Sequence, residues 1–348
     1  MTGEIAAILA MDGIASGAIY VLIGLGLVLI FAVTRVIFVP FGDIAAFTAL
    51  TLASLETGVR PGTVGLVAVL AVLATVVESI ALVRMRALHR LPRAVFFYLV
   101  LPLLPAAAIW FLAGASLSMP VRIALSLALV LPIAPLLDRI VFRPIADASV
   151  LLLLTVAVAL HFALSGLGLM FFGPEGVRTQ PLTDALFDVA GLIVNAQQLL
   201  IVAASIVFCG LLFLYFEYTI QGKALRATAV NRTGARLVGI RPTSTGTIAY
   251  LLASILAAIS GVLIAPVTTI FYDSGFLLGL KAFVGAIIGA MVSYPVTALG
   301  AVMVGLLESF TSFWLSAYKE VLVFGLLIPV LLWRSLSFAS HEEEEAEE

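Results

Sequence analysis

Long apolar stretches recur along this chain, separated by short polar loops. A hydrocarbon core of about 30 Å takes about 20 helical residues to cross, and most stretches have that length. Helices are expected because an isolated strand leaves backbone groups unsatisfied in lipid. The pattern predicts an all-α integral membrane protein, a polytopic bundle of about 10–11 transmembrane helices. The eleven stretches are 14–33, 36–55, 63–83, 94–113, 120–137, 148–170, 194–216, 243–267, 275–292, 297–317 and 319–333.

Basic residues are distributed unevenly between the loops. If the N-terminus is outside and all eleven stretches cross, four basic residues lie in outside loops: Arg60, Arg122, Arg178 and Lys319. The inside loops then hold thirteen: Arg35, Arg84, Arg86, Arg90, Arg93, Arg139, Arg143, Lys223, Arg226, Arg232, Arg236, Arg241 and Arg334. Because cytoplasmic loops carry the excess of Lys and Arg, the prediction is N-out/C-in, with loop 217–241 in the cytoplasm.

The composition agrees with a lipid environment. Hydrophobic residues make up 63% of the chain and charged residues 11%, against about 25% charged in soluble domains. Six of the acidic residues lie in the last seven positions, and such a run is typical of a solvated tail. We therefore expect one transmembrane domain, 1–338, followed by an acidic disordered tail, 339–348. The single cysteine, Cys209, excludes an internal disulfide.

Ionisable groups inside the apolar stretches are the candidates for function, because burying them in a membrane is costly. They are Asp43, Glu78, His161, Lys281 and Glu308. Glu78 is expected to pair with Arg84 and Arg86 near the end of its stretch, His161 to be a neutral hydrogen-bonded residue, and Glu308 to face the bundle interior. A structural hydrogen bond and a transport role are both open for Glu308.

Two stretches look irregular. Stretch 36–55 opens with Pro40, Gly42 and Asp43, and stretch 275–292 is short and contains Lys281. Interrupted or short segments can indicate a transport pathway. The alternative is an ordinary tilted span with a snorkelling charge at its end. Pairs of small residues four apart are expected to pack helices closely: Gly13 and Gly17, Ala45 and Ala49, and Gly285 and Gly289.

Several motifs do not occur. The sequence has no HExxH, CxxC, GxSxG or GxxxxGK[ST] pattern, so it predicts no metal site, no enzyme and no ATP binding through a phosphate loop. If the chain takes part in active transport, the energy comes from a partner or from an ion gradient.

Loop 217–241 is basic, with Lys223, Arg226 and Arg236 among its residues. Residues 224–238 are expected to form a short helix that ends at Gly239, a typical C-cap residue. Pro242 then prevents the helix from continuing. Three interpretations are open: a helix on the membrane surface, a folded-back connector, or an element that docks into a groove of a cytoplasmic protein.

The same loop carries a resemblance. The shared pattern is a glycine, a basic residue, an Arg-Ala step and an Ala-Arg-Leu-x-Gly-Ile ending. In this chain it is formed by Gly222, Lys223, Arg226, Ala227 and residues 235–240. Residues 275–290, 305–310 and 316–334 form a second matching block, and residues near the N-terminus, 142–160 and 171–176 also match. On these motifs, over about 80% of its length, the chain resembles the LivH-type permease subunit of bacterial branched-chain amino acid ABC transporters.

Four departures from that family are visible, one of which is the additional acidic tail 339–348. Residues 84–137 look like an insertion of two helices. The family usually has Ala-His-Gly-Asp where this chain has Pro40, Phe41, Gly42 and Asp43, and it tends to have Ala at Gly234.

The resemblance implies a translocation subunit of an ATP-driven importer for branched-chain or other small hydrophobic amino acids in a bacterial inner membrane. It implies no cofactor in this chain, because ATP is bound by cytoplasmic ATPase partners. The other implied partners are a second permease subunit, identical or similar, and an extracytoplasmic binding protein. Membrane lipid is expected around the bundle, and no nucleic acid.

The resemblance also assigns a coupling set, which is Gly222, Lys223, Arg226, Ala227, Arg236 and Gly239. The ionisable residues and the irregular stretches give the expected translocation pathway set, which is Gly42, Asp43, Lys281 and Glu308. The alternative function is an ion- or proton-coupled secondary transporter that uses Asp43, Glu78 and Glu308. A weaker alternative is an intramembrane enzyme that depends on Glu308 or His161.

Overall fold

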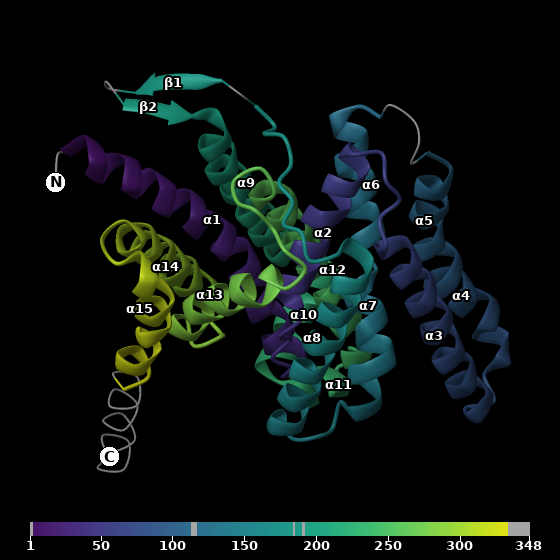
Figure 1. The fold of residues 1–348 in the computed structure, drawn as a ribbon. Helices are drawn as coiled ribbons and strands as arrows, with labels where there is room; N and C mark the ends of the chain where they lie inside the picture. Colours follow the sequence, from purple (N-terminus) through teal and green to yellow (C-terminus); the bar gives the residue numbers. More distant parts are fainter. Residues whose placement is uncertain (1–2, 113–116, 184, 190–191, 333–348) are drawn as a thin grey trace, which may run out of the picture.

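Helices account for nearly all of the structure, a computed structural model that describes residues 3–112, 117–183, 185–189 and 192–332 (Figure 1). Within these residues, eight helical segments are long and apolar enough to cross a membrane. This confirms the all-α membrane class. The other three apolar stretches, 36–55, 275–292 and 319–333, contain the shorter helices α2 (Phe41–Glu56), α13 (Ser274–Ile288) and α15 (Lys319–Gly325). The N-out/C-in orientation stays a prediction, and the tail 339–348 lies outside the described residues.

Six of the long segments are continuous α-helices. They are α1 (Gly3–Thr34), α3 (Thr63–Arg84), α8 (Val150–Phe172), α9 (Ala196–Tyr218), α12 (Pro242–Ile264) and α14 (Tyr294–Trp314). Side chains cap two of them: Ser149 accepts from the N–H of Leu152 before α8, and Asn195 accepts from the N–H of Gln197 before α9. Such caps satisfy backbone donors that have no partner within the helix.

The remaining two long segments, 88–112 and 119–145, are irregular. The first consists of η1 (Leu88–Arg90), α4 (Leu91–Val95), the π-helical η2 (Phe96–Val100) and α5 (Leu101–Leu112). The second consists of α6 (Met119–Val130), α7 (Ile133–Leu137), the π-helical η3 (Asp138–Phe142) and η4 (Arg143–Ile145). Proline residues, such as Pro105 and Pro132, lack the N–H that a regular helix needs. Both segments were expected from the sequence; that they form an insertion stays a prediction.

Helices α1 and α12 form the centre of the bundle. Within their most apolar windows, 83% of α1 and 72% of α12 is buried, against 39% or less for the six other long segments. In α1, Gly17 lies so close to α14 that a Cβ there would sit 2.7 Å from the Cα of Val302. A Cβ on Gly285 of α13 would lie 2.8 Å from the Cα of Ala301. The expected close packing at small residues is confirmed.

A β-hairpin interrupts the helical pattern and was not expected. Strands β1 (Leu186–Val189) and β2 (Leu192–Asn195) pair antiparallel, with Leu186 opposite Asn195. The hairpin lies at the end of the bundle opposite α11 (Arg232–Leu237), and α4 and α5 lie at the edge beside α3 (Figure 1). A single bridge between Val177 and Ile270 ties the segment before the hairpin to the loop before α13.

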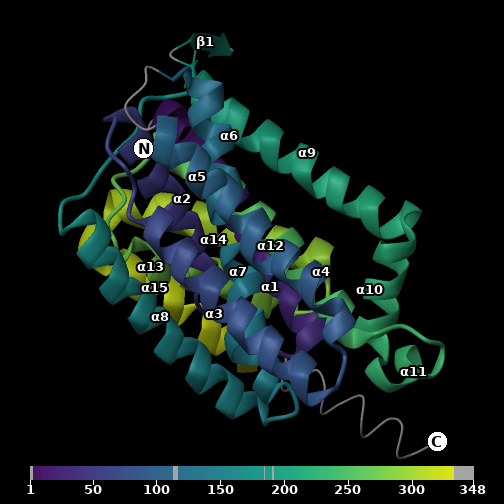
Figure 2. The same ribbon diagram turned by 90° about the vertical axis from the view of Figure 1, so that its right-hand side faces the viewer.

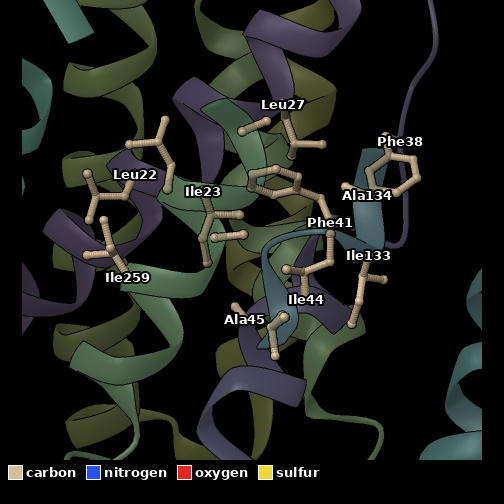
Figure 3. Close-up of a cluster of buried hydrophobic side chains, with 14 of the residues drawn as sticks. Leu22, Ile23, Leu27, Phe38, Phe41, Ile44, Ala45, Ile133, Ala134 and Ile259 are labelled. Atoms are coloured by element: carbon tan, nitrogen blue, oxygen red, sulfur yellow. The ribbon is translucent and has the colours of Figure 1, made fainter. Parts of the chain in front are cut away.

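The connection between α1 and α2 is an extended segment that runs back into the bundle. Arg35 takes a positive φ of 62° directly after α1, which turns the chain around. Phe38 packs edge-on against Phe142 and Tyr250, with ring centroids 5.6 and 5.3 Å apart. Phe41 points into the central apolar cluster, which includes Ile23 and Leu27 (Figure 3). These buried aromatic rings hold the first turn of α2 deep in the bundle.

Candidate functional site

The first turn of α2 lies at mid-depth of a spanning helix. His161 is the twelfth of the 23 residues of α8, about 17 Å along the helix at 1.5 Å per residue. Its Nδ1 lies 2.7 Å from Oδ2 of Asp43, although the two residues are 118 positions apart. Helix α2 therefore starts inside the bundle, and stretch 36–55 is interrupted as the sequence indicated.

Asp43 is nearly inaccessible, with 2% of its surface exposed. Only one of its carboxylate oxygens is bonded, because Oδ1 is buried without a hydrogen-bond partner. Asp43 is the third residue of α2, where the partial positive charge of a helix N-terminus favours a negative side chain. The sequence prediction that His161 is hydrogen-bonded is confirmed, and its ring also stacks on Phe276, with centroids 4.8 Å apart.

Helix α13 begins at the same place and crosses α2 there. A Cβ on Gly42 would lie 1.9 Å from the carbonyl oxygen of Gly275 and 2.7 Å from the N of Gly279. A Cβ on Gly275 would lie 2.6 Å from Oδ1 of Asp43. Only glycine fits at these two positions. The two short helices thus meet through their first turns, with Asp43 between them.

A second buried polar cluster lies further along α13. Lys281 donates to Oε1 of Glu308 at 2.6 Å and lies 3.2 Å from Oε1 of Glu320. The hydroxyl of Tyr20 donates to Oε2 of Glu308 at 2.6 Å. Lys281 is 6% exposed, so the alternative of a snorkelling end charge is wrong. Glu308 faces the interior as expected.

Glu78 forms an ion pair, as predicted, but with Arg139 of η3 instead of Arg84 and Arg86. The predicted partners were chosen because they are near in the sequence. Residues three or four apart share a helix face, and Arg84, six residues on, points elsewhere. The neighbouring segment 119–145 supplies Arg139 on the correct face.

Loop 217–241 forms two helices, α10 (Ile220–Val230) and α11, so the expected single helix over 224–238 is wrong. Asn231 is extended between them, and its side chain accepts a hydrogen bond from the N–H of Gly234 at 2.8 Å. Asn is a favourable N-cap residue, and this capping explains the break. Gly239 ends α11 with a φ of +87°, as predicted, and Ile240 donates to the carbonyl of Ala235.

The residues of the predicted coupling set lie around these two helices. A Cβ on Gly222 would lie 2.2 Å from the carbonyl oxygen of Tyr215, so α10 packs directly on the end of α9. Lys223, Arg226, Arg236 and Gly239 are exposed, whereas Ala227 is half-buried. Arg226 forms an exposed ion pair with Glu217 at 2.9 Å.

Large apolar side chains accompany these basic residues. Those that are at least 75% exposed on or beside α10 and α11 are Tyr218, Ile220, Val230, Leu237 and Val238. Both helices project from one end of the bundle below α9 (Figure 2). We call the surface formed by residues 218–239 the α10–α11 surface. It combines positive charge with exposed apolar area, which is typical of a contact surface. Among the described residues, no group of His, Cys, Asp and Glu could hold a metal ion.

Comparison with known proteins identifies the family. Residues 9–331 match the model of the branched-chain amino acid transport system permease component. The chain belongs to this family. A high-affinity branched-chain amino acid transport system permease protein of Pseudomonas aeruginosa, BraD, is 27% identical over 216 residues, covering 60% of this chain and 70% of that protein. The corresponding Escherichia coli protein, LivH, is 27% identical over 203 residues, covering 56% of this chain and 66% of that protein.

Family membership fixes the general role of this permease-family chain. It is a transport subunit rather than an enzyme, and a multi-pass protein of a bacterial inner membrane. The matched stretches cover about two thirds of the length of these relatives. No solved structure matches the chain. The resemblance drawn from the sequence motifs is confirmed at the level of the family.

Proposed function

We propose that this chain is a translocation subunit of an ATP-driven importer for branched-chain or other small hydrophobic amino acids. A second permease subunit, identical or similar, completes the pathway, and two cytoplasmic ATPases bind below it. An extracytoplasmic binding protein delivers the substrate. The observation that carries the proposal is the α10–α11 surface, which projects beyond the bundle at one end and exposes both basic and large apolar side chains.

The packing of this surface suggests how a movement would be transmitted. Gly222 brings α10 against the backbone of α9, and α11 leads within a few residues into α12, one of the two central helices. Arg143 links the start of α12 to η4 through the carbonyl of Thr243 and the hydroxyl of Thr247. A push by ATPase closure on α10 and α11 would therefore tilt α9 and α12 together, and with them the helices that surround Asp43.

The test is purification of the tagged chain from its native membrane in mild detergent, with identification of the proteins that accompany it. We expect a stoichiometric ATPase with a phosphate loop, and its loss when Arg226→Glu and Arg236→Glu are combined, because both side chains are exposed on the α10–α11 surface. The matched control combines Arg84→Glu with Arg86→Glu, because these two arginines are also exposed, at and just beyond the end of α3. The control variant should keep the ATPase. A chain that arrives without an ATPase in every version contradicts the proposal.

A further inference from the structure

The unbonded oxygen of Asp43 is the feature that the bundle itself does not explain. Asp43 is buried in the middle of the bundle, and a buried polar atom without a partner keeps the full cost of its desolvation. Charges in transmembrane segments are costly and usually mark a pathway or a partner. A carboxylate retained only for packing would be expected to use both oxygens.

Burial opposes the ionised form of Asp43, and two features of its surroundings offset this cost. The side chain sits in the first turn of α2, where the helix dipole stabilises negative charge. When Asp43 is ionised, Nδ1 of His161 donates to Oδ2 at 2.7 Å. These contacts hold Oδ2 and fix the direction of the carboxylate, so that Oδ1 faces the first turn of α13.

The cover over Oδ1 is a single turn of a short helix. Gly275 lies directly against Oδ1, because a Cβ there would approach it to 2.6 Å. The next residue, Phe276, stacks on His161 and is 37% exposed. The first turn of α13 is therefore partly accessible at Phe276, although Gly275 is buried. A displacement of the first turn of α13 away from α2 would uncover Oδ1 without breaking the bond between Asp43 and His161.

We propose that Oδ1 of Asp43 receives the α-ammonium group of the transported amino acid when the first turn of α13 moves off α2. The assignment rests on the proposed importer function and gives it a substrate contact. An ammonium group neutralises the buried carboxylate and forms a charge-assisted hydrogen bond with the free oxygen. The α-carboxylate of the same ligand meets the first turns of α2 and α13, where the partial positive charge of the two helix N-termini favours an anion. Some N–H groups of these turns already have acceptors, since Ile44 donates to the carbonyl of Pro40 and Phe276 to that of Asp273.

The experiment uses the whole importer in proteoliposomes: this chain, its second permease subunit, the ATPases and the binding protein. Uptake of labelled L-leucine and ATP hydrolysis are measured per assembled complex for wild type and Asp43→Asn, which keeps the shape and removes the charge. We expect uptake to fall at least about tenfold in the variant, the equivalent of one charge-assisted hydrogen bond, with ATP hydrolysis within about twofold of wild type.

The control is Glu78→Gln, which alters another carboxylate in an apolar stretch, ion-paired with Arg139. This variant should lower thermal stability yet keep uptake per assembled complex within about twofold, since the lost pair joins α3 to η3, outside the Asp43 site. Uptake by Asp43→Asn that stays within about twofold of wild type overturns the proposal. A wild-type chain that neither assembles with an ATPase nor supports uptake overturns the proposed function instead.

A second measurement covers the case in which Asp43→Asn does not assemble. L-photo-leucine, a diazirine analogue of leucine, is supplied to the wild-type importer during turnover, irradiated, and its attachment sites are mapped by mass spectrometry. We expect attachment within residues 41–47 or 274–281, abolished by excess L-leucine. Competable attachment found only elsewhere in the chain overturns the assignment.

Discussion

Two carboxylates face α13, the buried Asp43 and the partly buried Glu308, and they differ in how completely they are bonded. Both oxygens of Glu308 have donors, Lys281 on one side and Tyr20 on the other. Asp43 has one donor, His161, and one free oxygen. A fully bonded carboxylate stabilises the helices that supply its partners, whereas a half-bonded one under a thin cover is available to a ligand. Helix α13 therefore carries a candidate binding site at its first turn and, further along, a stabilising polar cluster. We call this cluster, formed by Lys281, Glu308, Glu320 and Tyr20, the clamp.

The clamp joins parts of the chain that are distant in sequence. Tyr20 belongs to α1 and Glu308 to α14, 288 residues later, while Glu320 at the start of α15 reaches the same ammonium group. That Lys281 and Glu308 line the translocation pathway stays a prediction. Their bonding to each other means that a substrate reaching them would first have to break the pair.

The largest effect is expected from removing the shared cation of the clamp. Lys281→Met leaves Glu308 without its ammonium partner and Glu320 with only the more distant Lys319, at 4.0 Å, and breaking a buried ion pair from one side costs about 3–5 kcal/mol. Thermal unfolding in detergent measures the loss. Adding Glu308→Gln should recover part of the stability, because the carboxylate of Glu308 is then no longer left without a cation. Equal loss in the single and double variants would contradict the clamp.

Separating α2 from α13 by one methyl group should have the next largest effect. Gly42→Ala places a Cβ within 1.9 Å of the Gly275 carbonyl oxygen, and such overpacking costs about 1–3 kcal/mol. Uptake should change as well, since the cover over Asp43 is displaced. Gly166→Ala in α8 is the control, because a Cβ there meets no atom within 4 Å. Equal unfolding temperatures for the two variants would count against the contact.

A comparable effect, measured as uptake, is expected at His161, which holds only one oxygen of Asp43. His161→Gln retains an N–H that can reach Oδ2, whereas His161→Phe fills a similar volume without a donor. The missing hydrogen bond to a charged group is worth about 1.5–3 kcal/mol. Leucine uptake should therefore fall by about tenfold or more in the phenylalanine variant and recover in the glutamine variant. Identical uptake in both would show that the imidazole serves only as packing.

Much of the fold was predictable because a helix that crosses a membrane requires a long apolar stretch in the sequence. Every predicted apolar stretch contains a helix, and the glycine pairs pack where their spacing indicated. The length of α2 and α13 was less certain, since the apolar runs continue into non-helical segments such as residues 35–40. There, aromatic packing decides the path of the chain, as Phe38 and Phe41 show.

The candidate site was predictable in its members but not in its pairs. Asp43, His161, Lys281 and Glu308 stood out as ionisable residues in apolar stretches, yet spacing along the chain does not tell which helices pack together. The Asp43–His161 pair bridges 118 residues. A usable signal existed, because buried charges in membranes are usually paired and the candidates were few. The break at Asn231 was also detectable, since Asn is a frequent N-cap.

The decisive measurement is a structure of the assembled importer trapped with L-leucine in the translocation pathway. We expect the first turn of α13 to have moved away from α2, and the leucine nitrogen to lie within hydrogen-bond distance of Oδ1 of Asp43, about 2.7–3.2 Å. A leucine bound elsewhere, with Gly275 still packed against Asp43, would contradict this expectation.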